Sequence, residues 1–249
     1  SERISDSDNS SKGGNINLDY KHEFSESSNL VARASWDLWV SDGTSTYKQH
    51  SLYPENKETS SWQKQESDNR SQSWEFQADY VNQFTEGSKL EAGYKGTLSS
   101  QKSPVETYSG MAIHESGEDY LEAILMIKER NGNVRSIDEL LYNKYSYDRN
   151  IQALYATFST KVNNFGLQLG LRGEYTDTET KSLGYGETEA TTVPYKDDYF
   201  SLFPSLFLSY SLPKNHEIQV NYTRRISRPR GWQLNPFMNM TDSLNISFG

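Results

Sequence analysis

Apolar and polar residues alternate along most of this chain, and the clearest example lies between Phe165 and Tyr175. In that stretch every second residue is apolar or aromatic, apart from one glycine, and a period of two is the period of a β-strand. A second β-rich run, Ile151–Thr160, precedes it. The intervening Asn163-Asn164 favours a tight turn, because Asn tolerates left-handed backbone. The pattern therefore predicts a long β-hairpin.

The two faces of this hairpin differ sharply in chemistry. One face carries Leu167, Leu169 and Leu171, while the other carries Gln168, Arg172 and Glu174. The pattern persists for about eleven residues, which is the length of strands that cross a membrane rather than the five or six residues typical of soluble strands. We expect the leucines to face lipid and the charged residues to face a polar interior. A large soluble β-sandwich is the alternative.

The same alternation recurs and predicts an all-β, antiparallel fold with four hairpins. Short turns join the strands within each hairpin, and three long loops, 41–71, 99–145 and 178–198, separate the hairpins, while Ser1–Gly14 is expected to be a loop. Short turns on one side and long loops on the other are typical of transmembrane β-barrels, and a sandwich has no need of them. The predicted strands are Asn15–Phe24, Leu30–Val40, Trp74–Phe84, Lys89–Leu98, Ile151–Thr160, Phe165–Tyr175, Tyr199–Ser211 and Glu217–Ile226.

Composition agrees with a barrel and removes several other classes of protein. The net charge of −9 and the pI of about 5.0 argue against binding nucleic acid. Mean hydropathy is −0.84 and no run of eighteen apolar residues occurs, so a membrane helix is not expected. The 13% aromatic content suits the girdles of a barrel at the membrane interfaces.

Catalytic and cofactor chemistry finds little support in the sequence. The chain has no Cys, which removes disulfides, thiolate metal sites and Cys nucleophiles. Its four His residues are scattered, and no HExxH, GxSxG or phosphate-binding loop is present. We therefore expect neither an enzyme nor a bound cofactor.

The stretch NYTRRISRPRGWQLNPF near the end of the chain resembles a signature of TonB-dependent receptors, in the outer-membrane β-barrel branch common in Bacteroidetes. The preceding run YFSLFPSLFL, Tyr199–Leu208, is similar to the strand before that signature. The resemblance covers the chain from about Asn15 to Gly249, apart from the helical segment described below. The matching residues are Tyr222, Arg224, Arg225, Ile226, Arg228, Pro229, Leu234, Asn235, Pro236 and Phe237.

This resemblance implies a barrel of about 22 strands with an internal plug, of which the chain would supply about eight. It further implies a location in the outer membrane of a Gram-negative cell, contact with membrane lipid, and coupling to the TonB complex through a plug domain outside this chain. The implied function is uptake of a scarce solute, such as a siderophore, cofactor, glycan or peptide. We expect residues 1–249 to be part of one such barrel and the chain to be a fragment of a longer protein.

We expect the motif residues to be structural rather than substrate-binding. Arg224 continues the line of Ile218, Val220 and Tyr222, near a strand end where a long side chain reaches the headgroups. Arg225 falls on the opposite, interior side. The run of strands is expected to end at Pro229 and Pro236, because proline has no backbone N–H to donate to a neighbouring strand.

One segment, Met111–Asp138, breaks the strand pattern. Ser116–Asp119 has the sequence of a capping box, and apolar residues then recur at helical spacing, which predicts a helix over Glu118–Arg130 inside a long extracellular loop. The segment also resembles the N-terminus of metal-dependent repressors of the diphtheria-toxin-repressor type. In that family the residues that align with Asp119 and Glu122 include metal ligands, but the other ligands and the recognition helix have no counterpart here. We expect no metal site and no DNA binding.

Three functional hypotheses follow. The first is the barrel wall of a TonB-dependent receptor. The second is a non-transporting outer-membrane barrel, either an adhesin or a barrel enzyme. The third, which rests on Met111–Asp138 alone, is a metal-responsive regulator.

Overall fold

Eight long antiparallel strands make up most of the molecule. The computed structural model describes residues 2–53, 57–115, 142–235, 238–242 and 245–248. The strands of the main sheet are β1 (Glu2–Ser25), β2 (Ser28–Tyr53), β3 (Lys57–Thr85), β4 (Ser88–Glu115), β5 (Asn143–Val162), β6 (Phe165–Leu183), β7 (Tyr195–Leu212) and β8 (His216–Thr223).

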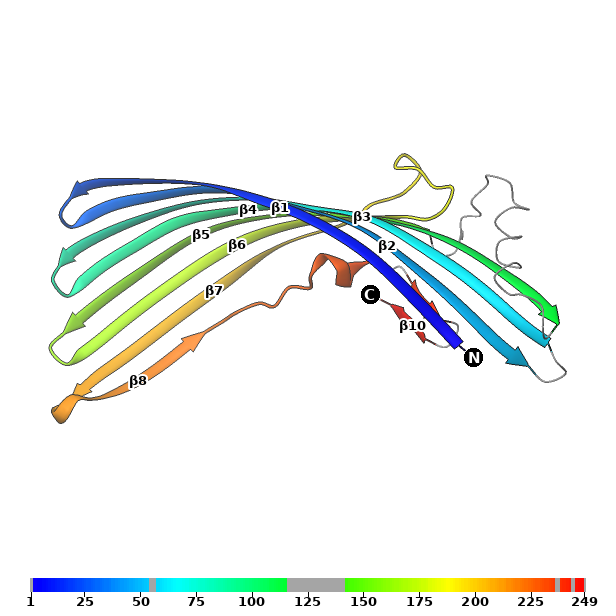
Figure 1. The fold of residues 1–249 in the computed structure, drawn as a ribbon. Helices are drawn as coiled ribbons and strands as arrows, with labels where there is room; N and C mark the ends of the chain where they lie inside the picture. Colours follow the sequence, from blue (N-terminus) through cyan, green and yellow to red (C-terminus); the bar gives the residue numbers. More distant parts are fainter. Residues whose placement is uncertain (1, 54–56, 116–141, 236–237, 243–244, 249) are drawn as a thin grey trace.

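The strands pair in sequence order and form one arched, open sheet with β1 and β8 at its edges (Figure 1). Four short connections join β1 to β2, β3 to β4, β5 to β6 and β7 to β8 at the same end of the sheet (Figure 1). Asn163 takes a φ of 54° in one of these turns, as its residue type predicts. The all-β, antiparallel fold with four hairpins is therefore confirmed.

The strands are much longer than the alternation predicts. Each of β2, β3 and β4 contains 26 to 29 residues, so most of the predicted loop 41–71 and the first part of the loop 99–145 are strand. The predicted loop Ser1–Gly14 is strand from Glu2 onward. These predictions were wrong because the two faces of these extensions are both polar. The hydropathy of these residues therefore does not alternate, although the hydrogen bonding between the strands continues.

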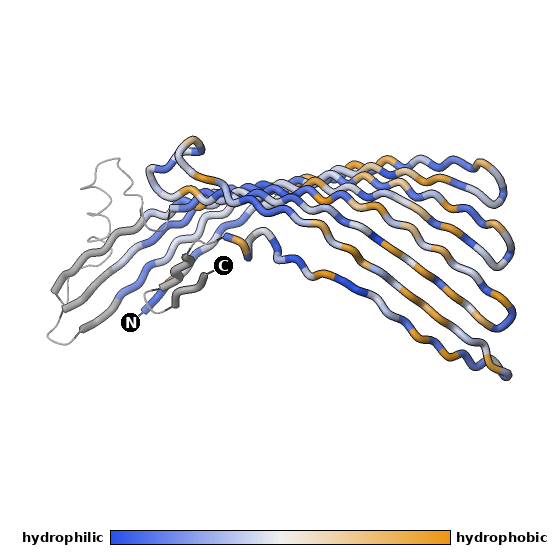
Figure 2. The backbone as a smooth tube through the Cα atoms, turned by 180° about the vertical axis from the view of Figure 1, so that it is seen from behind, coloured by the Kyte–Doolittle hydropathy of each residue, from blue (hydrophilic) through white to orange (hydrophobic). Residues whose placement is uncertain are grey.

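One face of the sheet carries a continuous apolar belt near the short turns. The register places the apolar residues of neighbouring strands directly opposite one another. One such row crosses four strands through Phe158, Leu169, Leu206 and Tyr222. Figure 2 shows hydrophobic residues gathered in the half of the sheet near these turns. Large side chains of this belt remain exposed, and a patch of this size favours contact with lipid. Exposed members are Leu18, Tyr20, Trp74, Phe76, Leu154, Leu169, Leu171, Phe200 and Leu202.

The opposite face, here called the inner face, is polar at the same height. Ion pairs connect neighbouring strands across it, with Arg33 Nε 2.9 Å from Asp19 Oδ1 and Lys95 Nζ 2.7 Å from Glu75 Oε1. Gln168 lies on this face between Ser159 and Phe207. The register thus separates the leucines of the hairpin from its charged residues, as the alternation predicts.

The remaining described elements are short. Two 3-10 helices, η1 (Pro213–Asn215) and η2 (Gly231–Leu234), lie in the C-terminal third, followed by the small hairpin β9 (Met238–Asp242) and β10 (Asn245–Phe248). No helix in the described ranges is long and apolar enough to cross a membrane. The predicted helix Glu118–Arg130, with Asp119 and Glu122, lies outside the described residues. Residues 111–115 of that segment belong to β4.

Candidate functional site

After β8 the chain turns away from the barrel wall and crosses the inner face of the sheet. Residues 224–235, here called the inward segment, contain η2 and run back over β5–β7 (Figure 1). The departure begins beside Pro204 of β7, whose carbonyl oxygen accepts the backbone N–H of Arg224 at 3.3 Å. Pro229 then lacks the N–H that a continuing strand would need. Several of the most buried side chains of the described sheet lie in this region, including Tyr145, Tyr147, Ala153 and Thr176.

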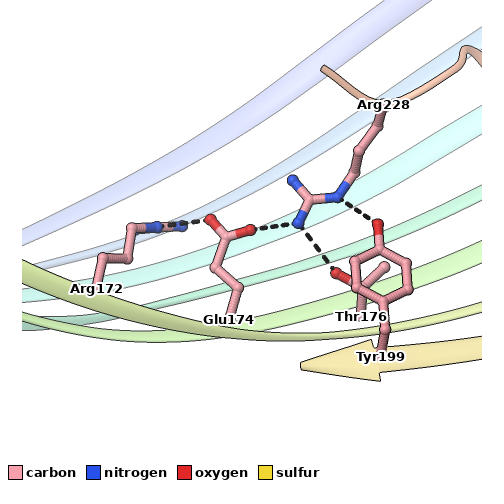
Figure 3. Close-up of polar contacts among 5 residues, drawn as sticks. All are labelled: Arg172, Glu174, Thr176, Tyr199 and Arg228. Carbon is pink, nitrogen blue, oxygen red and sulfur yellow. Dashed lines mark hydrogen bonds and ion pairs between the residues drawn. The ribbon is translucent and has the colours of Figure 1, made fainter. Parts of the chain in front are cut away.

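Arg228 fixes the first half of the inward segment to the wall (Figure 3). Its Nη2 atom donates to Glu174 Oε2 at 2.5 Å and to Thr176 Oγ1 at 3.2 Å, and its Nε donates to the Tyr199 hydroxyl at 2.8 Å. Arg172 Nε donates to the second oxygen of Glu174 at 2.6 Å. Glu174 therefore bridges two guanidinium groups, one from its own strand and one from the inward segment.

This ion-pair cluster is largely screened from water. The side chains of Glu174 and Arg228 are 9% and 17% exposed, and Thr176 is fully buried. Charge-assisted hydrogen bonds at such a site are stronger than those at an open surface, since water competes less for the donors. The planar guanidinium of Arg228 also lies over the ring of Tyr199, with 5.7 Å between its Cζ and the ring centroid.

A second anchor holds the end of the inward segment. The Tyr145 hydroxyl donates to the Gly231 carbonyl at 2.8 Å, and Asn143 Nδ2 donates to Asn235 Oδ1 at 3.2 Å. Burial, with a smaller contribution from Tyr147, raises the pKa of the Tyr145 phenol to about 12. Burial also raises the pKa of Tyr147. Both phenols therefore stay protonated at neutral pH, and Tyr145 keeps its proton for donation.

The backbone at Gly231 approaches the wall closely. A Cβ atom at this position would lie 2.8 Å from Gln101 Oε1 and 2.9 Å from the Tyr147 ring. Only glycine allows η2 to lie this near to β4 and β5 without displacing those side chains. The position of the segment thus depends on the glycine at 231 as well as on its hydrogen bonds.

The residues of the sequence motif fall at different places in this arrangement. Tyr222 is the last but one residue of β8 and lies on the belt side opposite Leu206. The strand predicted to reach Ile226 ends at Thr223, so Arg224 and Arg225 lie just beyond it, and both are exposed. Arg228, Pro229, Leu234 and Asn235 belong to the inward segment, and Pro236 and Phe237 lie outside the described residues.

Sequence reasoning missed the partners that receive the motif. Tyr145 lay in a predicted loop, and neither Asn143 nor Tyr199 was expected to contact the motif. A signal was present in the alternation of Asn143, Tyr145 and Tyr147, which continues the inner face of β5. The arrangement offers hydrogen bonds and fixed charges, which suit holding a segment or a ligand in place.

Comparison with known proteins identifies the family. The outer membrane protein beta-barrel family matches residues 28–249. Solved structures with a similar course include the ferric preacinetobactin receptor of Acinetobacter baumannii, with 13% identity over 87% of this chain and 30% of that chain, at a TM-score of 0.49. The ferric citrate transporter in its unliganded form has 10% identity over 85% of this chain and 35% of that chain, at 0.43.

A third similar structure is the RagAB peptide transporter, with 14% identity over 89% of this chain and 30% of that chain, at a TM-score of 0.41. The chain spans roughly a third of the length of these three proteins. A search of curated proteins gives no match.

Proposed function

Because the chain belongs to the outer membrane protein β-barrel family, we propose that it forms part of the wall of a TonB-dependent receptor that takes up a scarce solute. As a member of this family the chain lies in the cell outer membrane. The apolar belt then meets the lipid, and the polar inner face lines the interior of the barrel.

The inward segment carries this proposal. It contains most of the residues that resemble the TonB-dependent receptor signature, and it is tied to the inner face by Arg228 and Tyr145. A motif that turns into the interior would be placed where a plug and a passing solute meet the wall. A barrel that served only as an adhesin or a surface enzyme has no comparable need for an anchored interior segment.

The width of the wall supports a large barrel. The eight strands form an open sheet, and β1 and β8 do not pair with each other. Small eight-stranded barrels fill their interior with side chains, whereas barrels of about 22 strands hold a plug. The long strand extensions beyond the belt would form the extracellular chamber of such a receptor.

Uptake by the full-length protein tests the proposal. A strain that lacks the gene should grow poorly on at least one limiting solute, and the full-length gene should restore growth only when TonB is functional. Growth rates with and without a TonB deletion, at equal amounts of receptor in the outer membrane, measure this dependence. Restoration that is independent of TonB would favour a non-transporting barrel or a passive pore.

A further inference from the structure

Beyond the apolar belt, on the side away from the short turns, a stretch of the inner face of β1–β4 carries uncharged side chains. It is formed there by every second residue of Ser5–Gly13, Trp39–Tyr47, Gln63–Ser71 and Gln101–Ser103, here called the neutral face. Within these described runs the neutral face carries no charged side chain. Its residues are Ser, Asn and Gln, with two Gly and the aromatic rings of Trp39 and Tyr47.

The charge of this region lies on the other side of the same strands. Asp42, Glu66 and Lys102 are examples among the intervening residues. Closer to the short turns, the inner face is also charged and carries ion pairs such as that between Arg33 and Asp19. The uncharged surface is therefore confined to the inner face and to the stretch of β1–β4 beyond the apolar belt, although the chain as a whole has a net charge of −9.

Trp39 forms an aromatic platform within this surface. A Cβ atom on Gly13, the residue directly opposite on β1, would lie 2.5 Å from the Trp39 ring, so the ring lies against the bare backbone of Gly13. The side chain remains 53% exposed. Serine hydroxyl groups flank it, since Ser11 and Ser41 occupy the next row and Ser71 faces Trp39 from β3.

From this combination we infer that the neutral face binds an uncharged, hydroxyl-rich ligand, a neutral oligosaccharide, with Trp39 as its stacking platform. The C–H face of a pyranose ring is apolar and packs on an indole, while its hydroxyl groups exchange hydrogen bonds with hydroxyl and amide side chains. An anionic ferric chelate would lose hydration around Trp39 and find no cation there in return, since the Arg3 guanidinium lies at the other end of this face, over the Tyr47 ring, with 4.8 Å between its Cζ and the ring centroid. The inference rests on the proposed receptor function and names its substrate class.

Calorimetric titration of the full-length receptor in detergent tests the inference. The neutral probes are cellohexaose, maltohexaose and mannohexaose; the charged probes are hexagalacturonate, matched in size, and ferric citrate; tetraglycine represents peptides. We expect at least one neutral hexasaccharide to bind, and hexagalacturonate to bind at least about tenfold more weakly than that hexasaccharide because its carboxylates meet no cation around Trp39.

Two substitutions locate the binding surface. Trp39→Ala removes the platform and Gly13→Val displaces it, so each should weaken binding about tenfold or more. Gly14→Val is the matched control, because a Cβ atom at Gly14 meets nothing within 4 Å. Trp36→Ala removes a tryptophan from the opposite, belt face and should leave binding unchanged. Heat-modifiable mobility in gels verifies that each variant is folded.

Binding of ferric citrate or tetraglycine in place of the neutral probes, or of no probe at all, would overturn the substrate class. Binding of a neutral hexasaccharide that Trp39→Ala and Gly13→Val leave unchanged would overturn the assigned surface. Neither result touches the TonB dependence of uptake, which tests the receptor function separately.

Discussion

Arg228 and Glu174 form an ion pair across 54 residues of sequence, with 2.5 Å between Nη2 and Oε2. The carboxylate belongs to the barrel wall, and the guanidinium belongs to a segment that has left it. Glu174 already has a cationic neighbour on its own strand in Arg172. The second cation is therefore not required to neutralise Glu174, and its main effect is to fix the position of the inward segment.

Arg228→Ala should release the first half of the inward segment. We expect a loss of about 2–3 kcal/mol in the free energy of unfolding, because a poorly exposed ion pair and two further hydrogen bonds, to Thr176 and Tyr199, are broken. Urea titration of the full-length protein in lipid vesicles measures the loss. A double-mutant cycle with Glu174→Gln should give a coupling energy of at least about 0.5 kcal/mol. Arg225→Ala, at an exposed neighbouring position, is the control, and equal effects at 225 and 228 would contradict the anchor.

Leu169 and Gln168 should report opposite sides of the wall. Leu169→Arg places a charge within the apolar belt at a cost of roughly 2–4 kcal/mol, so assembly in the outer membrane should fall strongly. Gln168→Arg should be nearly silent, because that side chain lies on the polar inner face. Single cysteines with fluorophores at the two positions measure the same difference, since the chain has no other Cys. Lipid-soluble quenchers should affect position 169 alone, and quenching at both would refute the assigned faces.

Alkaline pH should weaken the second anchor. The pKa of the Tyr145 phenol is about 12 in the folded state against an ordinary value of 10.0. The protonated form is thus favoured by folding, so the stabilisation is complete below pH 10 and disappears between pH 10 and 12. The difference in unfolding free energy between the wild type and Tyr145→Phe should shrink across that window, by at most about 2–3 kcal/mol. The exposed Tyr185→Phe is the control, and a constant difference for Tyr145→Phe would contradict the prediction.

Residues 116–141 should be dispensable for the wall. β4 is paired with β3 as far as Glu115, and β5 begins at Asn143 opposite Val105 of β4. A replacement must therefore span about ten residues of strand, or about 33 Å. A flexible Gly/Ser linker of about 14 residues can reach that distance. We expect the replaced protein to insert and to show unchanged heat-modifiable mobility. Loss of insertion would mean that this segment belongs to the wall.

The fold was predictable from the sequence wherever the two faces of a strand differ. The pattern around Leu169 and Glu174 specifies strand, register and face together, because a slip by one residue would turn leucine toward the polar side. The extensions of β1–β4 were not predictable in this way, since Ser, Asn and Gln on one side and Asp and Lys on the other leave hydropathy flat.

The candidate site was predictable only in part. The residues of the motif could be read from their resemblance to a family, but the pairing of Tyr199 with Arg228 and of Tyr145 with Gly231 depends on the way the strands and the inward segment come together. The spacing of residues within a short stretch of sequence cannot predict contacts between residues so far apart in the chain. The Trp39 platform likewise depends on the register that places Gly13 opposite it.

The strand order has a consequence for the route by which the chain folds. Every pairing in the eight-stranded sheet joins neighbours in sequence, so each hairpin can close a short loop before the next one docks. The contact between Arg228 and Glu174 spans 54 residues, and the site that receives Arg228 is complete only when β6 and β7 are aligned. The inward segment should therefore close last, and Arg228→Ala should speed unfolding while leaving the rate of sheet formation almost unchanged.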